Sequence, residues 1–199
     1  MGCCYSSVPP DGDGVQTLPW LPNYVQKKIA ETGEDYAGYG LCVLDCRTLA
    51  NQQAIWCKVS GQPAEFGFRP EKEFEQYARQ GNVPSMLAFN QEAIWRKLCG
   101  EQVETLPFPP TDLQRSDAKK YENKGTRQER SLWRLGILVN QEAMWKKLTD
   151  SAAVSYLPHP VSADVRNFSG YTHKSCHHHN LTCRLWMNDA AIFLKLHCV

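Results

Sequence analysis

Apolar positions along the chain fall into short stretches with helical spacing, and several of these stretches are followed by Gly or Pro. In segment 20–33, Val25 and Ile29 share one face of a predicted helix, and a Gly follows at its end. Segment 70–80 predicts a second helix, with Pro at its start and Phe, Tyr and Ala on its apolar stripe. Segment 111–114 reads Thr-Asp-Leu-Gln, a capping box that predicts another helix start.

One nine-residue pattern occurs three times, at 51–59, 90–98 and 140–148. It reads Asn-Gln-Gln-Ala-Ile-Trp-Cys-Lys-Val, Asn-Gln-Glu-Ala-Ile-Trp-Arg-Lys-Leu and Asn-Gln-Glu-Ala-Met-Trp-Lys-Lys-Leu. Each copy predicts a short helix or part of a longer one, with the Asn as N-cap. Segment 41–49 before the first copy fits either a buried strand or a lead-in to that copy. The copies begin 39 and 50 residues apart, which predicts similar helices on variable linkers instead of a regular stacked array.

The Trp of each copy, at Trp56, Trp95 and Trp145, shares a helical face with the apolar residue three positions later, such as Leu98 or Leu148. Two interpretations are open. Trp is strongly enriched at binding hot spots, so these residues are candidate partner-binding positions. The same residues can instead form a small internal core.

After residue 150 the helical pattern weakens, so we expect a weakly patterned C-terminal segment over 151–199. It contains a His tract at 177–179, a type of tract that can bind zinc. The Cys and His spacings match no zinc finger, so no metal site is predicted. The apolar residues after 185 fit either a docked final helix or a poorly constrained tail.

These patterns predict a mainly α fold of several short helices joined by Pro- and Gly-rich loops. The expected organisation is a flexible N-terminal segment over 1–19, a helical body over 20–150 and the C-terminal segment over 151–199. Hydrophobic residues make up 42% of the 199 residues, among 12 Pro and 13 Gly, which indicates a small core.

Charge and motifs narrow the functional class. A net charge of +1 gives no strong attraction to nucleic acid, and the charged stretch 115–130 mixes both signs. The chain has no nucleophile elbow, phosphate-binding loop or zinc-protease motif. Cys42 and Cys46 lie four residues apart with no basic neighbour beside Cys42, so a buried structural pair is favoured. We therefore expect a non-enzymatic protein without a cofactor.

The N-terminus carries the most specific chemical signal. It reads Met-Gly-Cys-Cys-Tyr-Ser, which matches the N-myristoylation pattern with Gly2 as the acceptor. One myristoyl chain binds membranes only marginally, so stable anchoring needs a second signal. Cys3 and Cys4 can supply it through S-palmitoylation, whereas the first basic residue is Lys27. With no secretory signal or membrane-spanning stretch expected, the predicted location is the cytoplasmic face of a membrane.

Two short resemblances accompany these signals. Residues 1–7 resemble the lipidated head of the Ragulator subunit that tethers its complex to late endosomes and lysosomes, which implies acylation of Gly2, Cys3 and Cys4. The Gln-Glu-x-Ile-Trp-Arg unit at 91–96 resembles a motif of small ciliary microtubule inner proteins, which implies an extended chain on tubulin.

Two functions follow as expectations. The first is a membrane-tethered adaptor, held by its acyl chains and binding an unknown protein partner through Trp-centred helices. The alternative is a structural protein of the ciliary axoneme with tubulin as its partner.

Overall fold

The computed structural model describes residues 17–34, 41–121, 130–151, 157 and 177–197, and all regular secondary structure within them is helical. The mainly α prediction is therefore confirmed. The helices are α1 (Tyr24–Thr32), α2 (Val43–Val59), α3 (Glu73–Arg79), α4 (Val83–Leu98), α5 (Asp112–Tyr121), α6 (Arg130–Leu148) and α7 (His177–Leu196).

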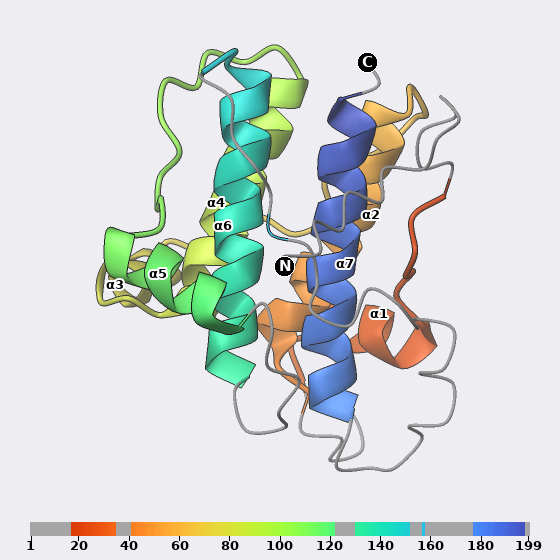
Figure 1. The fold of residues 1–199 in the computed structure, drawn as a ribbon. Helices are drawn as coiled ribbons and strands as arrows, with labels where there is room; N and C mark the ends of the chain where they lie inside the picture. Colours follow the sequence, from red (N-terminus) through yellow and green to blue (C-terminus); the bar gives the residue numbers. More distant parts are fainter. Residues whose placement is uncertain (1–16, 35–40, 122–129, 152–156, 158–176, 198–199) are drawn as a thin grey trace, which may run out of the picture.

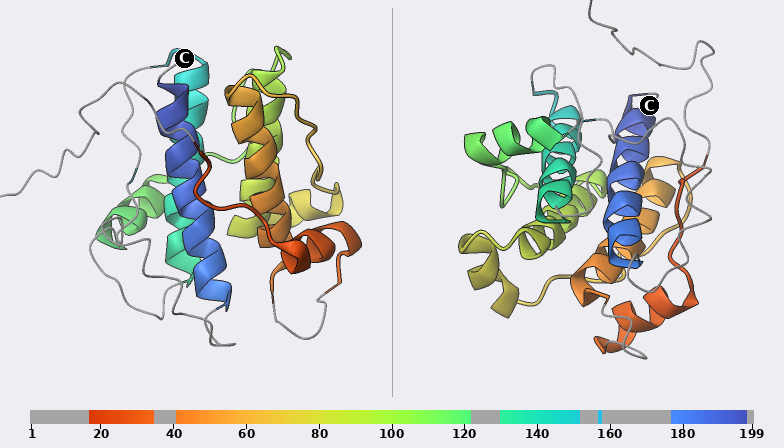
Figure 2. Two further views of the ribbon diagram at one scale, coloured as in Figure 1. Left: turned by 90° about the vertical axis from the view of Figure 1, so that its right-hand side faces the viewer. Right: turned by 60° about the horizontal axis from the view of Figure 1, so that its bottom comes forward.

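Four long helices form a closed ring. Helix α2 contacts α4, α4 contacts α6, α6 contacts α7, and α7 returns to α2. All four run in the same direction, from the bottom to the top of Figure 1, and Figure 2 shows the ring from two other sides. Because neighbouring long helices run parallel, the chain must return to the bottom before it begins each new one. The connections between the long helices are therefore long. The short helices α3 and α5 lie in two of these connections, and α1 precedes α2. Each short helix packs against the long helix that follows it.

The interior of the ring has two apolar clusters. One lies toward the N-terminal ends of the long helices, and the other is formed mainly by the Ala-Ile-Trp portions of the repeated pattern. Between them, each long helix contributes a buried Asn and the residue after it. We call this set the polar layer: Asn51, Gln52, Asn90, Gln91, Asn140, Gln141, Asn188 and Asp189.

Several local helix signals are confirmed. Helix α1 ends at Gly33, whose φ of 73° lies in the left-handed region that favours Gly. At the start of α5 the main-chain N–H of Thr111 donates to Gln114 Oε1 at 2.8 Å, and the N–H of Gln114 donates to Thr111 Oγ1 at 3.2 Å. The predicted helix over 70–80 is α3, and segment 41–49 leads into α2 instead of forming a strand.

The predicted N-cap role of the repeated Asn is wrong. Helices α2, α4 and α6 begin at least seven residues before their Asn, which places it in the helix interior together with the following Gln or Glu. Interior Asn is unfavourable for an isolated helix, so its contacts outside the helix must offset that cost. The N-cap of α4 is Asn82, whose Oδ1 accepts the N–H of Ser85 at 3.1 Å.

The C-terminal segment is more ordered than its pattern indicated. Of the two possibilities for the residues after 185, the docked helix is the one observed, and it starts as early as His177. Leu181, Leu185 and Trp186 of α7 are buried in the core. Residues 177–196 therefore belong to the helical body and not to a tail.

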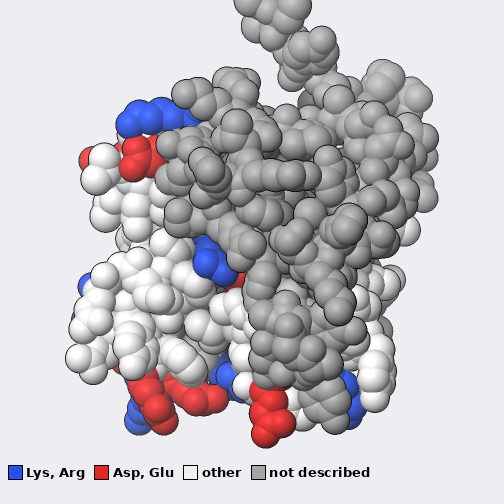
Figure 3. All heavy atoms as spheres, turned by 90° about the horizontal axis from the view of Figure 1, so that it is seen from below, with Lys and Arg blue, Asp and Glu red and all other residues white. Residues whose placement is uncertain are grey.

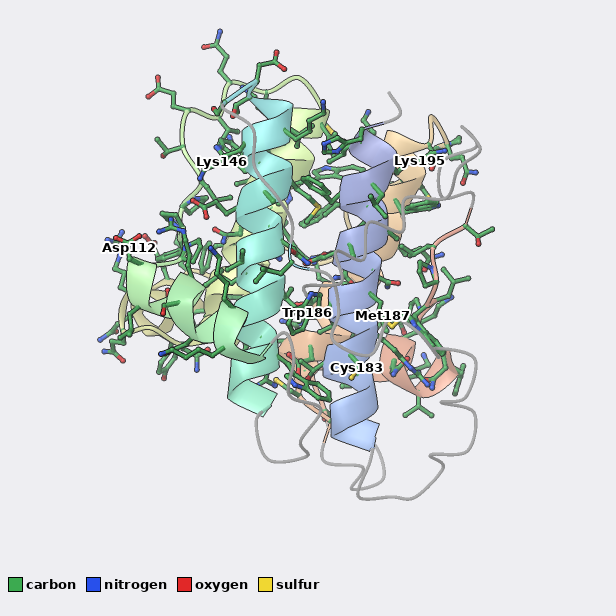
Figure 4. The ribbon with its side chains drawn as sticks, viewed as in Figure 1. Asp112, Lys146, Cys183, Trp186, Met187 and Lys195 are labelled. Carbon is green, nitrogen blue, oxygen red and sulfur yellow. The ribbon has the colours of Figure 1, made fainter. Side chains whose placement is uncertain are left out.

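Helix α7 packs closely on α6 through a large and a small residue. The indole of Trp186 lies between the two helices (Figure 4), and its Nε1–H donates to the carbonyl oxygen of Leu157 at 2.9 Å. A methyl group on Gly136 of α6 would overlap ring atoms of Trp186. The pair therefore depends on the absence of a side chain at residue 136.

We expect Gly136→Ala to lower the free energy of unfolding by about 1–3 kcal/mol, because overpacking displaces a buried ring. The better helix propensity of Ala offsets only about 1 kcal/mol of the cost. Urea unfolding followed by circular dichroism measures the difference. Gly136→Ala should cost less in a Trp186→Phe background than in the parent chain, since the smaller ring leaves room for the methyl group. A single Gly136→Ala variant as stable as the parent chain would contradict the close packing.

Candidate functional site

The repeated Asn holds a distant backbone segment through both ends of its amide. In the first copy, Asn51 Nδ2 donates to the carbonyl oxygen of Phe68 at 2.8 Å. Its Oδ1 accepts the main-chain N–H of the same residue at 3.1 Å. The side chain thus pairs with Phe68 as one residue of a strand would pair with another. Asn suits this role because one short amide carries both a donor and an acceptor.

The same two-bond clamp recurs three more times. Each Asn is at most 2% exposed, and each holds the N–H and the carbonyl of one residue. The donor and acceptor distances are 2.8 and 2.9 Å for Asn90 with Phe108, 3.1 and 2.7 Å for Asn140 with Leu157, and 2.8 and 3.0 Å for Asn188 with Trp20.

The clamps connect neighbouring helices in a cycle. The Asn of α2 holds a residue before α3 and α4, the Asn of α4 holds one before α5 and α6, and the Asn of α6 holds Leu157, which precedes α7. Helix α7 completes the cycle, because Asn188 holds Trp20 at the start of the chain's described part, 168 positions away. The protein is therefore built from four related units, and the last unit closes on the first.

The fourth unit was missed in the sequence. Residues 188–196 read Asn-Asp-Ala-Ala-Ile-Phe-Leu-Lys-Leu, with Asp in place of Gln and Phe in place of Trp. A looser pattern, Asn-x-x-Ala, then Ile or Met, then an aromatic residue, would have found it. A second signal was the distance from each Asn to the residue that it holds next along the chain, which is 17, 18 and 17 positions in the first three units.

Three of the clamped segments also share a pattern. Segments 18–22, 66–70 and 106–110 read Leu-Pro-Trp-Leu-Pro, Phe-Gly-Phe-Arg-Pro and Leu-Pro-Phe-Pro-Pro. We call them straps. The clamped residue is the aromatic one, and the final Pro precedes a short helix. The first residue of each strap packs in the second apolar cluster, as when the ring of Phe66 stacks on Trp95 with 5.5 Å between centroids.

In three of the four units the residue after the Asn is a Gln that links its long helix directly to the previous one in the ring. Gln91 Nε2 donates to the carbonyl of Thr48 in α2, and Gln141 Nε2 donates to that of Leu87 in α4, at 3.2 and 3.3 Å. Gln52 Nε2 donates to the carbonyl of Leu185 in α7 at 2.7 Å. Each acceptor lies three positions before an Asn of the layer. Since a shifted helix would leave buried amides unpaired, the polar layer specifies the register of the ring.

Asp189 stands where the other three units have Gln, and it is 1% exposed. Its Oδ1 accepts Gln52 Nε2–H at 2.7 Å, while its Oδ2 is buried without a hydrogen-bond partner. Burial raises the pKa of this carboxyl well above its usual range, although the bond from Gln52 lowers it. Asp189 is the one position of the layer whose side chain can change its charge.

The predicted partner-binding residues lie inward. Trp56, Trp95 and Trp145 are only 6–8% exposed and belong to the second apolar cluster. Leu98 and Leu148 are partly buried and pack against that cluster. Of the two interpretations open for the Trp residues, their burial supports the core. A docking surface would have to come from other residues.

The candidate chemical groups are distributed as follows. Gly2, Cys3, Cys4 and the His tract side chains lie outside the part that the structure describes. Cys42 forms the N-cap of α2 and Cys46 is buried, and burial, followed by the charge of Asp45, raises the pKa of Cys42. Burial raises the pKa of Cys183 to about 12, which keeps it a thiol. Among the described residues no group of three His, Cys, Asp or Glu is placed to hold a metal ion.

Seen from below, basic and acidic side chains alternate around the edge of the described surface (Figure 3). None of the described helices combines the length and apolar character that crossing a bilayer requires. No family model, curated protein or solved structure matches the chain.

Proposed function

We propose that the protein is a non-enzymatic, membrane-tethered adaptor, a rigid helical ring held on a membrane by N-terminal acyl chains. The observation that carries the proposal is the Met-Gly-Cys-Cys-Tyr-Ser start, with a myristoylation acceptor at Gly2 and palmitoylation acceptors at Cys3 and Cys4. Two chains satisfy the requirement for stable anchoring, which one myristoyl group does not meet.

The connection between the acylated N-terminal segment, which we call the tether, and the ring supports this assignment. The strap at 18–22 follows the acylation residues in the chain, and Asn188 clamps its Trp20 from the last helix. In the chain, the tether therefore leads into the strap that Asn188 clamps, at the point where the last unit closes on the first. A compact body attached in this way can present its outer surface at a fixed site on the membrane.

The surface available to partners differs from the one expected. With the Trp residues inside, the large apolar side chains that remain exposed in the described part of the chain lie on or beside the short helices: Leu21, Tyr24, Tyr77 and Leu113. The ciliary alternative needs an extended chain, so the burial of the repeated units in a compact ring gives it no support.

Metabolic labelling with a clickable myristate tests the anchor. The parent chain is expected to carry the label and to sediment with membranes, and Gly2→Ala should lose both properties, because only an N-terminal Gly accepts the chain. Replacing Cys3 and Cys4 by Ser should keep the label and reduce membrane attachment, since one chain holds weakly. An unlabelled parent chain, or labelled protein that stays in the soluble fraction, would refute the proposed function.

A further inference from the structure

Two of the most exposed apolar side chains lie directly after the tether. Leu21 is 58% exposed and Tyr24 is 74% exposed, and they are separated by three positions. We propose that Leu21, Tyr24 and Lys27 form a second membrane contact, which seats the first strap and α1 on a bilayer containing anionic lipid. The inference rests on the proposed function, because the acyl chains bring this face to the membrane.

Chain length makes this contact reachable. Leu21 follows Gly2 by 19 positions, so its backbone lies within about 65 Å of the acylated residue even if the segment is fully extended. A weak contact becomes effective when a tether holds it near its target at high local concentration. Among the residues that the structure describes, the face at residues 21–27 is therefore the first exposed apolar surface after the acylation positions.

The face is also fixed in place before binding. Asn188 clamps both main-chain groups of Trp20, next to Leu21. Asn23, next to Tyr24, forms a capping box with Gln26, in which both bonds are 2.9 Å long. The backbone between these points loses little freedom on binding, and this lowers the entropic cost of the contact.

The side chains suit a membrane interface more than a hydrocarbon core or a protein core. Tyr has an apolar ring and a polar hydroxyl, and it is enriched at the level of lipid headgroups. Lys27 is exposed one turn after Tyr24 and on the same face of α1, where it can meet an anionic headgroup. Its neighbour Lys28 is instead paired with Glu31 at 3.3 Å. The contact thus combines a modest apolar area with one available cation.

The test compares two double variants of the full-length, myristoylated chain. One carries Leu21→Ser and Tyr24→Ser. The other carries Leu113→Ser and Tyr77→Ser, which removes the same two side-chain types from α5 and α3. Binding is measured by co-sedimentation with vesicles of phosphatidylcholine, with or without phosphatidylserine. We expect the first variant to bind about tenfold more weakly than the parent chain and the second to bind equally well.

A third variant, Lys27→Gln, should bind about fivefold more weakly to vesicles with phosphatidylserine and unchanged to neutral vesicles. Equal binding of the parent chain and the Leu21→Ser, Tyr24→Ser variant would overturn the inference. So would a loss seen only with cell membranes and not with vesicles, because that result assigns the face to a protein. In both cases the acyl-dependent binding would persist, whereas failure of the proposed function removes binding from the parent chain itself.

Discussion

Replacing Asn140 by Ala is expected to lower the free energy of unfolding by about 2–4 kcal/mol, the largest effect among the clamp residues. The change leaves the main-chain N–H of Leu157 unpaired, which costs about 1–3 kcal/mol for a buried group. The carbonyl of Leu157 loses one of its two donors and keeps the Nε1–H of Trp186. Asn140 and its two bonds are fully buried, whereas the bonds of the other clamps are partly buried. Urea denaturation measured by circular dichroism gives the difference.

Asn140→Asp tests whether the side chain must both donate and accept a hydrogen bond, or whether accepting one is enough. Asp can accept the N–H of Leu157 but, when ionised, has no proton to donate to its carbonyl, so we expect a loss at least as large as for Ala. Asn82 provides the matched control, because its Oδ1 acts only as an acceptor, for the N–H and the Oγ–H of Ser85. Asn82→Asp should therefore be nearly neutral. Similar unfolding curves for Asn140→Asp and the parent chain would show that the clamp contributes little.

Replacing Asp189 by Asn is expected to stabilise the protein at neutral pH and to flatten the dependence of its stability on pH. In the other units a Gln donates to the carbonyl three positions before the Asn of the previous helix. For Asp189 that carbonyl belongs to Ile137. Only a protonated Asp189 could donate there, and its Oδ2 is now without a partner. Asn has nearly the same shape and supplies the missing donor without a charge.

The sign follows from the raised pKa of Asp189 in the folded protein. Below about pH 4 the carboxyl is protonated in both states, so its full contribution to stability is present. As the pH rises above that value, the unfolded chain loses the proton first. Stability then falls by about 1.4 kcal/mol per pH unit until the pH reaches the folded pKa.

Unfolding free energies measured between pH 5 and 8 test this dependence of stability on the protonation of Asp189. This pH range lies above the unfolded pKa of about 4. The Asp189→Asn variant should lose less stability than the parent chain as the pH rises. Asp150→Asn serves as the control, because Asp150 is exposed and its φ of 49° is one that Asn tolerates. Parallel pH curves for the parent chain and the Asp189→Asn variant would mean that Asp189 does not titrate between the two states as described.

The amino-acid sequence by itself determined the helical class, three of the four repeated units and several helix ends. These features depend on local interactions, such as the apolar spacing in α1 and α3, the capping box at Thr111 and the left-handed Gly33. Each signal lies within a few residues of the structure that it specifies, and for that reason it is visible without the fold.

Only the tertiary structure decided what the repeated Asn does. Asn favours N-caps in isolated helices, yet here its amide pairs with a backbone segment 17 or 18 positions away, or 168 for Asn188. The uneven spacing of the copies concealed the ring, because the copies begin 39 and 50 residues apart while the first three clamps each span 17 or 18 positions. Burial of the Trp residues likewise depends on all four units meeting. These contacts join residues far apart in the sequence, so they stabilise the protein only once the ring has closed.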